Sequence, residues 1–120
     1  MTIQNIADTY KIPYIILYEE CPGYIMFTAD NIIKLIEKIQ SECYPVCFIG
    51  VNKEKKGQYN FNCSWECLRN NNETMPNYTR RSCAEAVEFV DKVTKAGGKL
   101  LFEIDIFDFS MEQLIMRTRT

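Results

Sequence analysis

The sequence predicts an α+β fold, with a mainly antiparallel five-stranded sheet and helices packed on one of its faces. Three observations lead to this prediction. Hydrophobic residues make up 47% of the 120-residue chain and charged residues 25%, the balance of one globular domain over residues 1–120. Short apolar segments alternate with amphipathic ones in the order α-ββα-ββα-β-α. Turn-forming residues separate paired apolar segments, which favours hairpins and antiparallel pairing.

The N-terminal segment predicts a short helix followed by a hairpin. Thr2 is a suitable N-cap, and Pro13 ends the helix because it disfavours helical geometry in the residue before it. The apolar stripe of this helix consists of Ile3, Ile6, Ala7 and Tyr10. Residues 14–19 are apolar at nearly every position, which predicts a central strand. A turn at 21–23 then leads to a second strand at 24–28.

The middle of the chain predicts a helix and a second hairpin. Residues 30–40 place their isoleucines and Leu35 on one face and charged residues on the other, which is typical of an amphipathic helix. Strands are expected at 46–52 and 59–67, with a loop at 54–57 between them. The second of these strands alternates, and we expect its odd-numbered residues to point inward: Tyr59, Phe61, Cys63, Trp65 and Cys67.

The C-terminal third predicts a long helix, a strand and a last short helix. Ser82 and Glu85 have the spacing of a capping box, so we expect the long helix to begin there, after a polar loop. The glycine pair at 97–98 ends it. A fifth strand is expected at 100–107, and a short helix after Ser110.

The charge balance excludes one class of function and favours one compartment. Lys and Arg total 14 against 16 Asp and Glu, a net charge of -2, which argues against a general nucleic-acid binder. The N-terminus lacks the basic region of a signal peptide, and no apolar run has the length of a membrane span. We therefore expect a cytoplasmic protein. The abundance of Ile, Asn, Lys, Tyr and Phe fits an AT-rich genome, such as that of a low-GC bacterium, its phage or a virus, and a viral chain would act in the host cytoplasm.

The chain has six cysteines and no histidine, which limits its chemistry. Ser-His and Cys-His catalytic pairs and histidine metal ligands are excluded. The cysteines are Cys21, Cys43, Cys47, Cys63, Cys67 and Cys83. Their spacing matches no zinc or redox motif, so we expect no metal, no cofactor and mainly buried thiols. The alternatives are a metal site or a disulfide across the hairpin, with Cys47 near Cys63 and Cys43 near Cys67.

The strongest local signal for a ligand lies at residues 77–83. Arg80 and Arg81 directly precede the expected helix N-terminus at Ser82, where free amides and the helix dipole favour anions. The expected ligand-binding residues are Asn77, Tyr78, Arg80, Arg81, Ser82, Cys83 and, as a stacking surface, Trp65. The alternative interpretation is that both arginines are solvated and balance the carboxylates of the helix.

The aromatic residues of the fourth strand have two interpretations. Tyr59, Phe61 and Trp65 share one face if the strand alternates regularly. They form a stacking surface for a base or a partner side chain if that face is open, and they belong to the core if helices cover it.

Cys83 and a group of three carboxylates are the remaining candidates for catalysis, and for each of them a structural role is favoured. Cys83 lies in the first turn of the expected helix, where the dipole lowers a thiol pKa, but its place on the apolar stripe favours core packing. Glu103, Asp105 and Asp108 could hold Mg²⁺, yet alternating acidic residues are more typical of a solvated strand face. We therefore assign no catalytic residue.

These patterns favour a small non-enzymatic binding protein that occupies a partner protein or sequesters a ligand, as immunity-type and phage anti-defence-type inhibitors do. The alternative is a binder of a nucleotide or another phosphorylated small molecule at Arg80, Arg81 and Ser82. A third hypothesis is an enzyme that depends on Cys83 or on a carboxylate-bound metal. Expected partners are a protein or an anionic small molecule, not a membrane. Open sheet edges and an apolar C-terminal segment also predict a homodimer.

Overall fold

The computed structural model describes residues 2–107, and the α+β class is confirmed. The elements are α1 (Ile3–Thr9), β1 (Ile15–Ile16), β2 (Ile25–Met26), α2 (Ala29–Ser41), β3 (Val46–Lys55), β4 (Gln58–Glu66), α3 (Met75–Lys95) and β5 (Leu100–Ile106). The helix expected after Ser110 and the carboxylate of Asp108 lie outside the described residues.

The strands form two antiparallel sheets, so the expected single five-stranded sheet is wrong. One sheet has the order β4-β3-β5, and the other pairs β1 with β2. An isolated bridge between Phe27 and Phe102 connects them, with N–H···O distances of 2.8 Å in both directions. The strand expected at 14–19 shrinks to two exposed residues, because consecutive turns at 18–21 and 21–24 take up the chain between β1 and β2.

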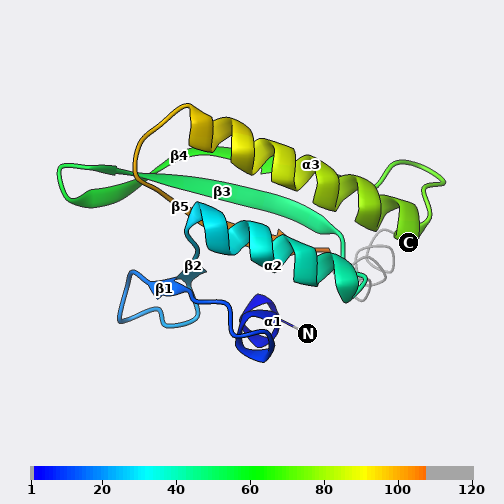
Figure 1. Cartoon of the computed structure of the whole chain (residues 1–120), viewed down its shortest axis with the longest axis horizontal. Coiled ribbons are helices and arrows are strands. Elements are labelled where there is room, and N and C mark those ends of the chain that lie inside the picture. Colours follow the sequence, from blue (N-terminus) through cyan, green and yellow to red (C-terminus); the bar gives the residue numbers. More distant parts are fainter. Residues whose placement is uncertain (1, 108–120) are drawn as a thin grey trace, which may run out of the picture.

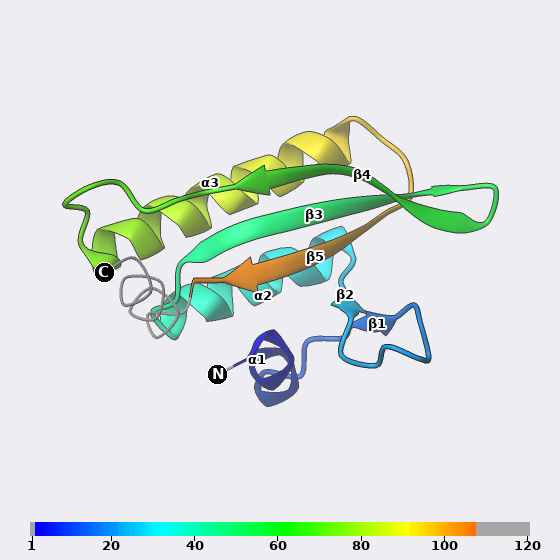
Figure 2. The same cartoon turned by 180° about the vertical axis from the view of Figure 1, so that it is seen from behind.

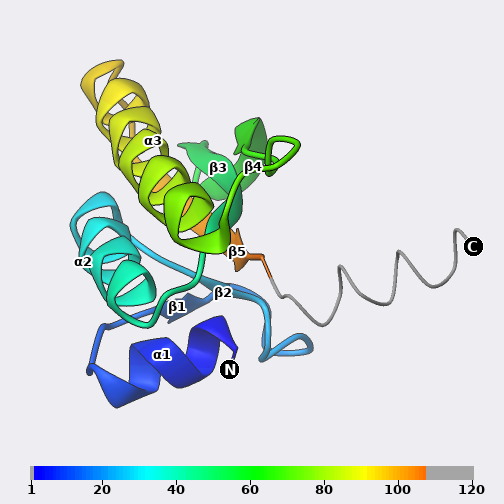
Figure 3. The same ribbon diagram turned by 90° about the vertical axis from the view of Figure 1, so that its right-hand side faces the viewer.

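Two helices cover one face of the three-stranded sheet. α2 and α3 lie side by side across it, and α1 packs near α2 and β5 (Figure 1). The opposite face of the sheet carries no helix from the described residues, as the views from behind and from the side show (Figure 2, Figure 3). The core between helices and sheet contains Ile32, Leu35, Ile36, Ile39, Ile49, Val51, Cys83, Ala86, Val90, Phe102 and Ile104.

The first two helices begin at threonine N-caps, of which the sequence predicts the one at Thr2. The Thr2 hydroxyl accepts a hydrogen bond from the N–H of Asn5 at 3.1 Å, and the Thr28 hydroxyl accepts from the N–H of Asn31 at 3.4 Å. The apolar stripe of α2 is buried, as its periodicity predicts.

The N-cap of the third helix lies eight residues before the expected one, so the capping box at Ser82 is wrong. Thr74 is the N-cap of α3 and accepts from the N–H of Asn77 at 3.3 Å, and Pro76 occupies the first turn. Ser82 lies fully buried inside the helix. Its hydroxyl accepts from the N–H of Val46 at 3.0 Å and so joins α3 to the start of β3.

The second hairpin is tighter than expected. Lys56 and Gly57 form a two-residue turn in which both φ angles are positive, at 54° and 78°, and Lys55 pairs with Gln58. The four-residue loop expected at 54–57 is therefore wrong. This tighter turn moves the register of the entire hairpin.

The changed register places different cysteines side by side. The N–H of Cys67 donates to the carbonyl of Cys47 at 3.0 Å, whereas Cys63 lies opposite Val51. The expected neighbours, Cys47 with Cys63 and Cys43 with Cys67, are therefore wrong. All six cysteines are free.

Candidate functional site

Arg81 is fully engaged within the fold. Its Nε and Nη2 donate to the two carboxylate oxygens of Glu73, both at 2.8 Å, and Nη2 also donates to the carbonyl of Leu68 at 2.7 Å. Nη1 lies 3.1 Å from the sulfur of Cys67 and 3.4 Å from a carboxylate oxygen of Glu85. The bidentate pairing with Arg81 lowers the pKa of Glu73 to about 2. Arg81 thus fastens the loop before α3 to the helix and has little capacity left for a ligand.

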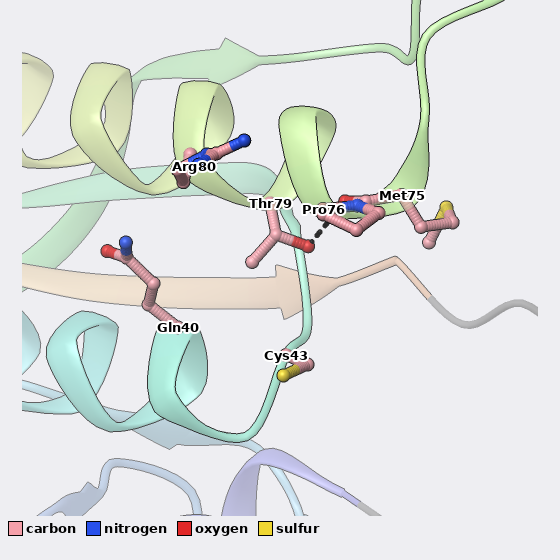
Figure 4. A pocket seen from close by; sticks show the side chains of 6 residues that line it. All are labelled: Gln40, Cys43, Met75, Pro76, Thr79 and Arg80. Atoms are coloured by element: carbon pink, nitrogen blue, oxygen red, sulfur yellow. Dashed lines mark hydrogen bonds between the residues drawn. The ribbon is translucent and has the colours of Figure 1, made fainter.

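Arg80 remains exposed and lines a shallow cleft between the C-terminal end of α2 and the first turns of α3 (Figure 4). The cleft holds about 270 Å³ and is lined by Gln40, Cys43, Met75, Pro76, Thr79 and Arg80. The Arg80 guanidinium donates to the side-chain oxygen of Asn77 at 2.5 Å. Pro76 has no N–H, and Thr74 already accepts the N–H of Asn77. The helix N-terminus therefore offers few amides to an anion.

Three other residues of the expected ligand set are internal. Tyr78 is buried, and its hydroxyl donates to the carbonyl of Cys67 at 2.5 Å. Ser82 is committed to the N–H of Val46. Cys83 belongs to the core, and burial raises its pKa to about 11, so its thiol is protonated near neutral pH. The structure thus does not bring these residues together around a ligand.

The uncovered side of the sheet presents a different surface, which we call the open face. Pairing in the sheet sets its residues in rows, because directly opposite residues share a face. From one end to the other the rows are Glu66-Phe48-Asp105, Ser64-Gly50-Glu103, Phe61-Asn52-Leu101 and Tyr59-Glu54. The open face therefore combines three aromatic rings with four carboxylates.

An extra residue in β4 brings two of these rings to the open face. The register shifts there: Val51 pairs with Cys63, but Asn52 pairs with Phe61, so Asn62 has no partner and forms a bulge. The bulge puts Phe61 on the face opposite Cys63, and Phe61 is 62% exposed. The expectation that the odd-numbered residues of this strand share one face is therefore wrong.

Trp65 lies on the covered side instead. Its ring stacks on that of Phe89 in α3, with centroids 6.2 Å apart and planes inclined by 23°. It packs against the core next to Ile49, its partner in β3. Tyr59, Phe61 and Trp65 thus do not form the common stacking surface that regular alternation predicts.

Glu103 is held close against the centre of the open face. A Cβ atom at Gly50 would clash with the Glu103 carboxylate, so the missing side chain of Gly50 makes room for it. The hydroxyl of Tyr24, from the segment before β2, hydrogen-bonds with this carboxylate, which raises the pKa of Tyr24 to about 12. Tyr24 packs against Tyr18 with ring centroids 6.0 Å apart, and both are exposed. These two tyrosines extend the aromatic character of the open face past β5.

One polar group on the open face lacks a partner. Asn52 is 7% exposed, and its Nδ2 donates to no group of the described residues. It lies between Phe61 and Leu101 in its row. A buried donor without an acceptor costs free energy, so this position destabilises the isolated fold.

Other classes of site find no support in residues 2–107. No group of three or more cysteine or acidic side chains there is arranged to hold a metal ion, and no helix there is long and apolar enough to cross a membrane. Glu103 and Asp105 lie in different rows of the open face. Comparisons with protein-family models, curated proteins and solved structures find no match for the chain.

Proposed function

We propose that this protein binds a partner protein through the open face and inhibits it by occupying its surface, in the manner of an immunity-type or phage anti-defence-type inhibitor. The observation that carries the proposal is the asymmetry of the sheet. Helices cover one face, while the other presents aromatic rings among carboxylates, with Phe61 62% exposed. An exposed ring of this size next to β-strand backbone is typical of an interface and costs free energy if it stays in water.

The chemistry of the open face indicates the chemistry of the partner. Phe48, Tyr59 and Phe61 can supply the rigid aromatic contacts that dominate binding free energies. The four carboxylates surround them and favour a partner surface rich in Lys and Arg. The unpaired Nδ2 of Asn52 would donate to a backbone carbonyl of such a partner after a small rearrangement.

The same geometry weakens the alternatives. A nucleotide site at Arg80, Arg81 and Ser82 loses two of its three residues to internal contacts. A Cys83 nucleophile is buried and protonated. The cleft beside Arg80 has only one cationic group, so it supports weak anion binding at most.

Affinity capture with charge-reversed variants tests the proposal. The tagged chain and the double variant Glu66→Lys/Asp105→Lys are compared on the lysate of a low-GC bacterium. A matched control, Glu88→Lys/Asp91→Lys, reverses two exposed charges on the outer surface of α3. We expect one protein to be retained by the parent and the control but lost from the open-face variant. With that protein purified, Phe61→Ala should weaken the affinity about 30-fold, since a truncated hot-spot residue costs ~2 kcal/mol or more.

Two results would contradict the proposal. One is that the parent retains no protein in excess over an unrelated acidic domain of the same size. The other is that the open-face variant and the α3 control retain the same protein equally, because the binding surface would then lie elsewhere on the chain.

A further inference from the structure

The outer edge of β4 is a second interaction surface, formed by backbone groups and not by the side chains that make the open face. β4 pairs with β3 on one side, and no described strand pairs with the other side. Natural edge strands carry lysines or prolines, or are very short, and these features prevent them from pairing with another strand. β4 has nine residues, contains neither Lys, Arg nor Pro, and has Glu66 as its single charge. This edge is thus able to accept another strand.

The register shows which backbone groups point outward from this edge. Lys55 and Gln58 flank the two-residue turn and form a hydrogen-bonded pair, so the next residues alternate between inward and outward groups. Tyr59 and Phe61 therefore direct their N–H and C=O groups away from β3. Counting from the other end, the N–H of Cys67 bonds inward to Cys47 at 3.0 Å, so Glu66 and Ser64 point outward.

The bulge makes this outward set symmetric. Without the extra residue at Asn62, outward groups would continue at every second position from Tyr59. With it they fall at Tyr59, Phe61, Ser64 and Glu66, which are arranged evenly about the midpoint between residues 62 and 63. A strand with this spacing is complementary to an antiparallel copy of itself.

We propose that β4 pairs antiparallel with β4 of a second copy of this chain, with Phe61 opposite Ser64 and Tyr59 opposite Glu66 in each direction. The pairing is two-fold symmetric, so both copies use the same surface. It joins the two three-stranded sheets into one sheet of six strands. All four outward residues also lie on the open face, so the helices of both copies stay on the opposite side and do not obstruct the contact.

The charges are compatible with a second copy as the occupant. Glu66 meets a tyrosine of the other copy, and the two Glu66 side chains lie at opposite ends of the paired segment, so no like charges face each other. Phe61 lies next to the symmetry axis, where the second copy would cover part of its exposed ring. A strand of another protein would need the same irregular spacing of outward groups, which this chain already provides.

Mass and amide exchange together test the proposal. At ~100 μM, a concentration well above ordinary dimer dissociation constants of a few μM, light scattering should give about twice the 14.1 kDa of one chain. Ser64→Pro should give a single chain, because proline removes an outward N–H and leaves the β3 ladder intact. Ser64→Thr, which keeps the N–H, is the matched control and should remain a dimer.

A measurement on the unmodified chain guards against misfolding of the proline variant. Between ~1 and ~100 μM, exchange of the Phe61 and Ser64 amides should slow about 5-fold, because these amides exchange from the monomer, whose share of the chains falls from about two-thirds to about one-tenth when the dissociation constant is a few μM. The inward amide of Trp65 should exchange at the same rate at both concentrations. A monomer at ~100 μM would overturn the proposal and leave the edge to another occupant. A dimer whose Phe61 and Ser64 amides show no dependence on concentration would overturn it too, since the contact would lie elsewhere. Neither result bears on partner binding by the open face, which the charge-reversed variants test.

Discussion

The two faces of the three-stranded sheet are built from alternate residues of the same strands, yet they differ in almost every physical property. On the covered face, Ile49 and Val51 of β3 are excluded from water by α2 and α3. On the open face, their neighbour Phe48 lies between the carboxylates of Glu66 and Asp105. The covered face is therefore the source of stability, and the open face contributes little to it and is available for the proposed contact with a partner.

The largest expected effect is a difference in the free energy of unfolding between two Phe→Ala variants, one on each face of the sheet. Phe102→Ala on the covered side should lower the free energy of unfolding by about 3–5 kcal/mol, since it leaves a cavity in the core. Phe61→Ala on the open face should change it by less than ~0.5 kcal/mol. Urea unfolding of both variants measures this difference. Equal losses of stability would mean that Phe61 is part of the core and that the open face is not open.

A buried hydroxyl gives a smaller effect on the covered side. Ser82→Ala should cost about 1–3 kcal/mol, because it leaves the buried N–H of Val46 without an acceptor. Thr74→Ala, which removes the true cap of α3, should cost ~1 kcal/mol. Thermal unfolding of the two variants compares them. If Thr74→Ala had no effect, the start of α3 at Met75 would be in doubt.

The smallest expected effect is the pH dependence of stability that arises from the ion pair between Glu73 and Arg81. The pKa of Glu73 lies at about 2 in the folded protein, below the ~4.3 of a glutamate in an unfolded chain. The unfolded state therefore takes up the proton first, so the stabilisation is present above pH ~4.3 and is lost as the pH falls towards 2.

Tm measured between pH 5 and pH 2 tests this coupling. The Tm of the parent should fall more steeply over that interval than the Tm of Glu73→Gln, which cannot titrate at this position. Parallel curves would show that Arg81 does not lower the pKa of Glu73, and the guanidinium of Arg81 would then be available for a ligand.

The parts of the fold that follow from local signals were predictable. Thr2 and Thr28 cap helices whose apolar stripes repeat with helical spacing, and both helices form as expected. The start of α3 had an equally local signal, because Thr74 followed by Pro76 is typical of a helix N-terminus. The Ser82–Glu85 spacing imitates a capping box. The Ser82 hydroxyl instead bonds to the N–H of Val46, which lies 36 residues away in sequence, and so no local signal indicates that Ser82 is buried.

The candidate site was less predictable because it depends on register. Regular alternation along β4 would place Phe61 and Trp65 on the same face of the sheet, and only the bulge at Asn62 puts them on opposite faces. That bulge arises from pairing with β3 and has no signature in the strand itself. Arg81 likewise looked available, since nothing in its neighbourhood in sequence indicates that Glu73 and the carbonyl of Leu68 take its donors.

The central claim is that the open face is where this protein meets its partner, and an amide-exchange footprint on the complex with the captured protein tests it most directly. Binding should slow exchange at the amides beneath the open face, at Phe48, Gly50 and Asp105, which the proposed edge contact of β4 does not involve. Exchange in α2 and in the outer surface of α3 should stay unchanged. Protection confined to the cleft beside Arg80, or to the helices, with the sheet amides unaffected, would contradict the claim and assign the binding surface to the covered side of the molecule.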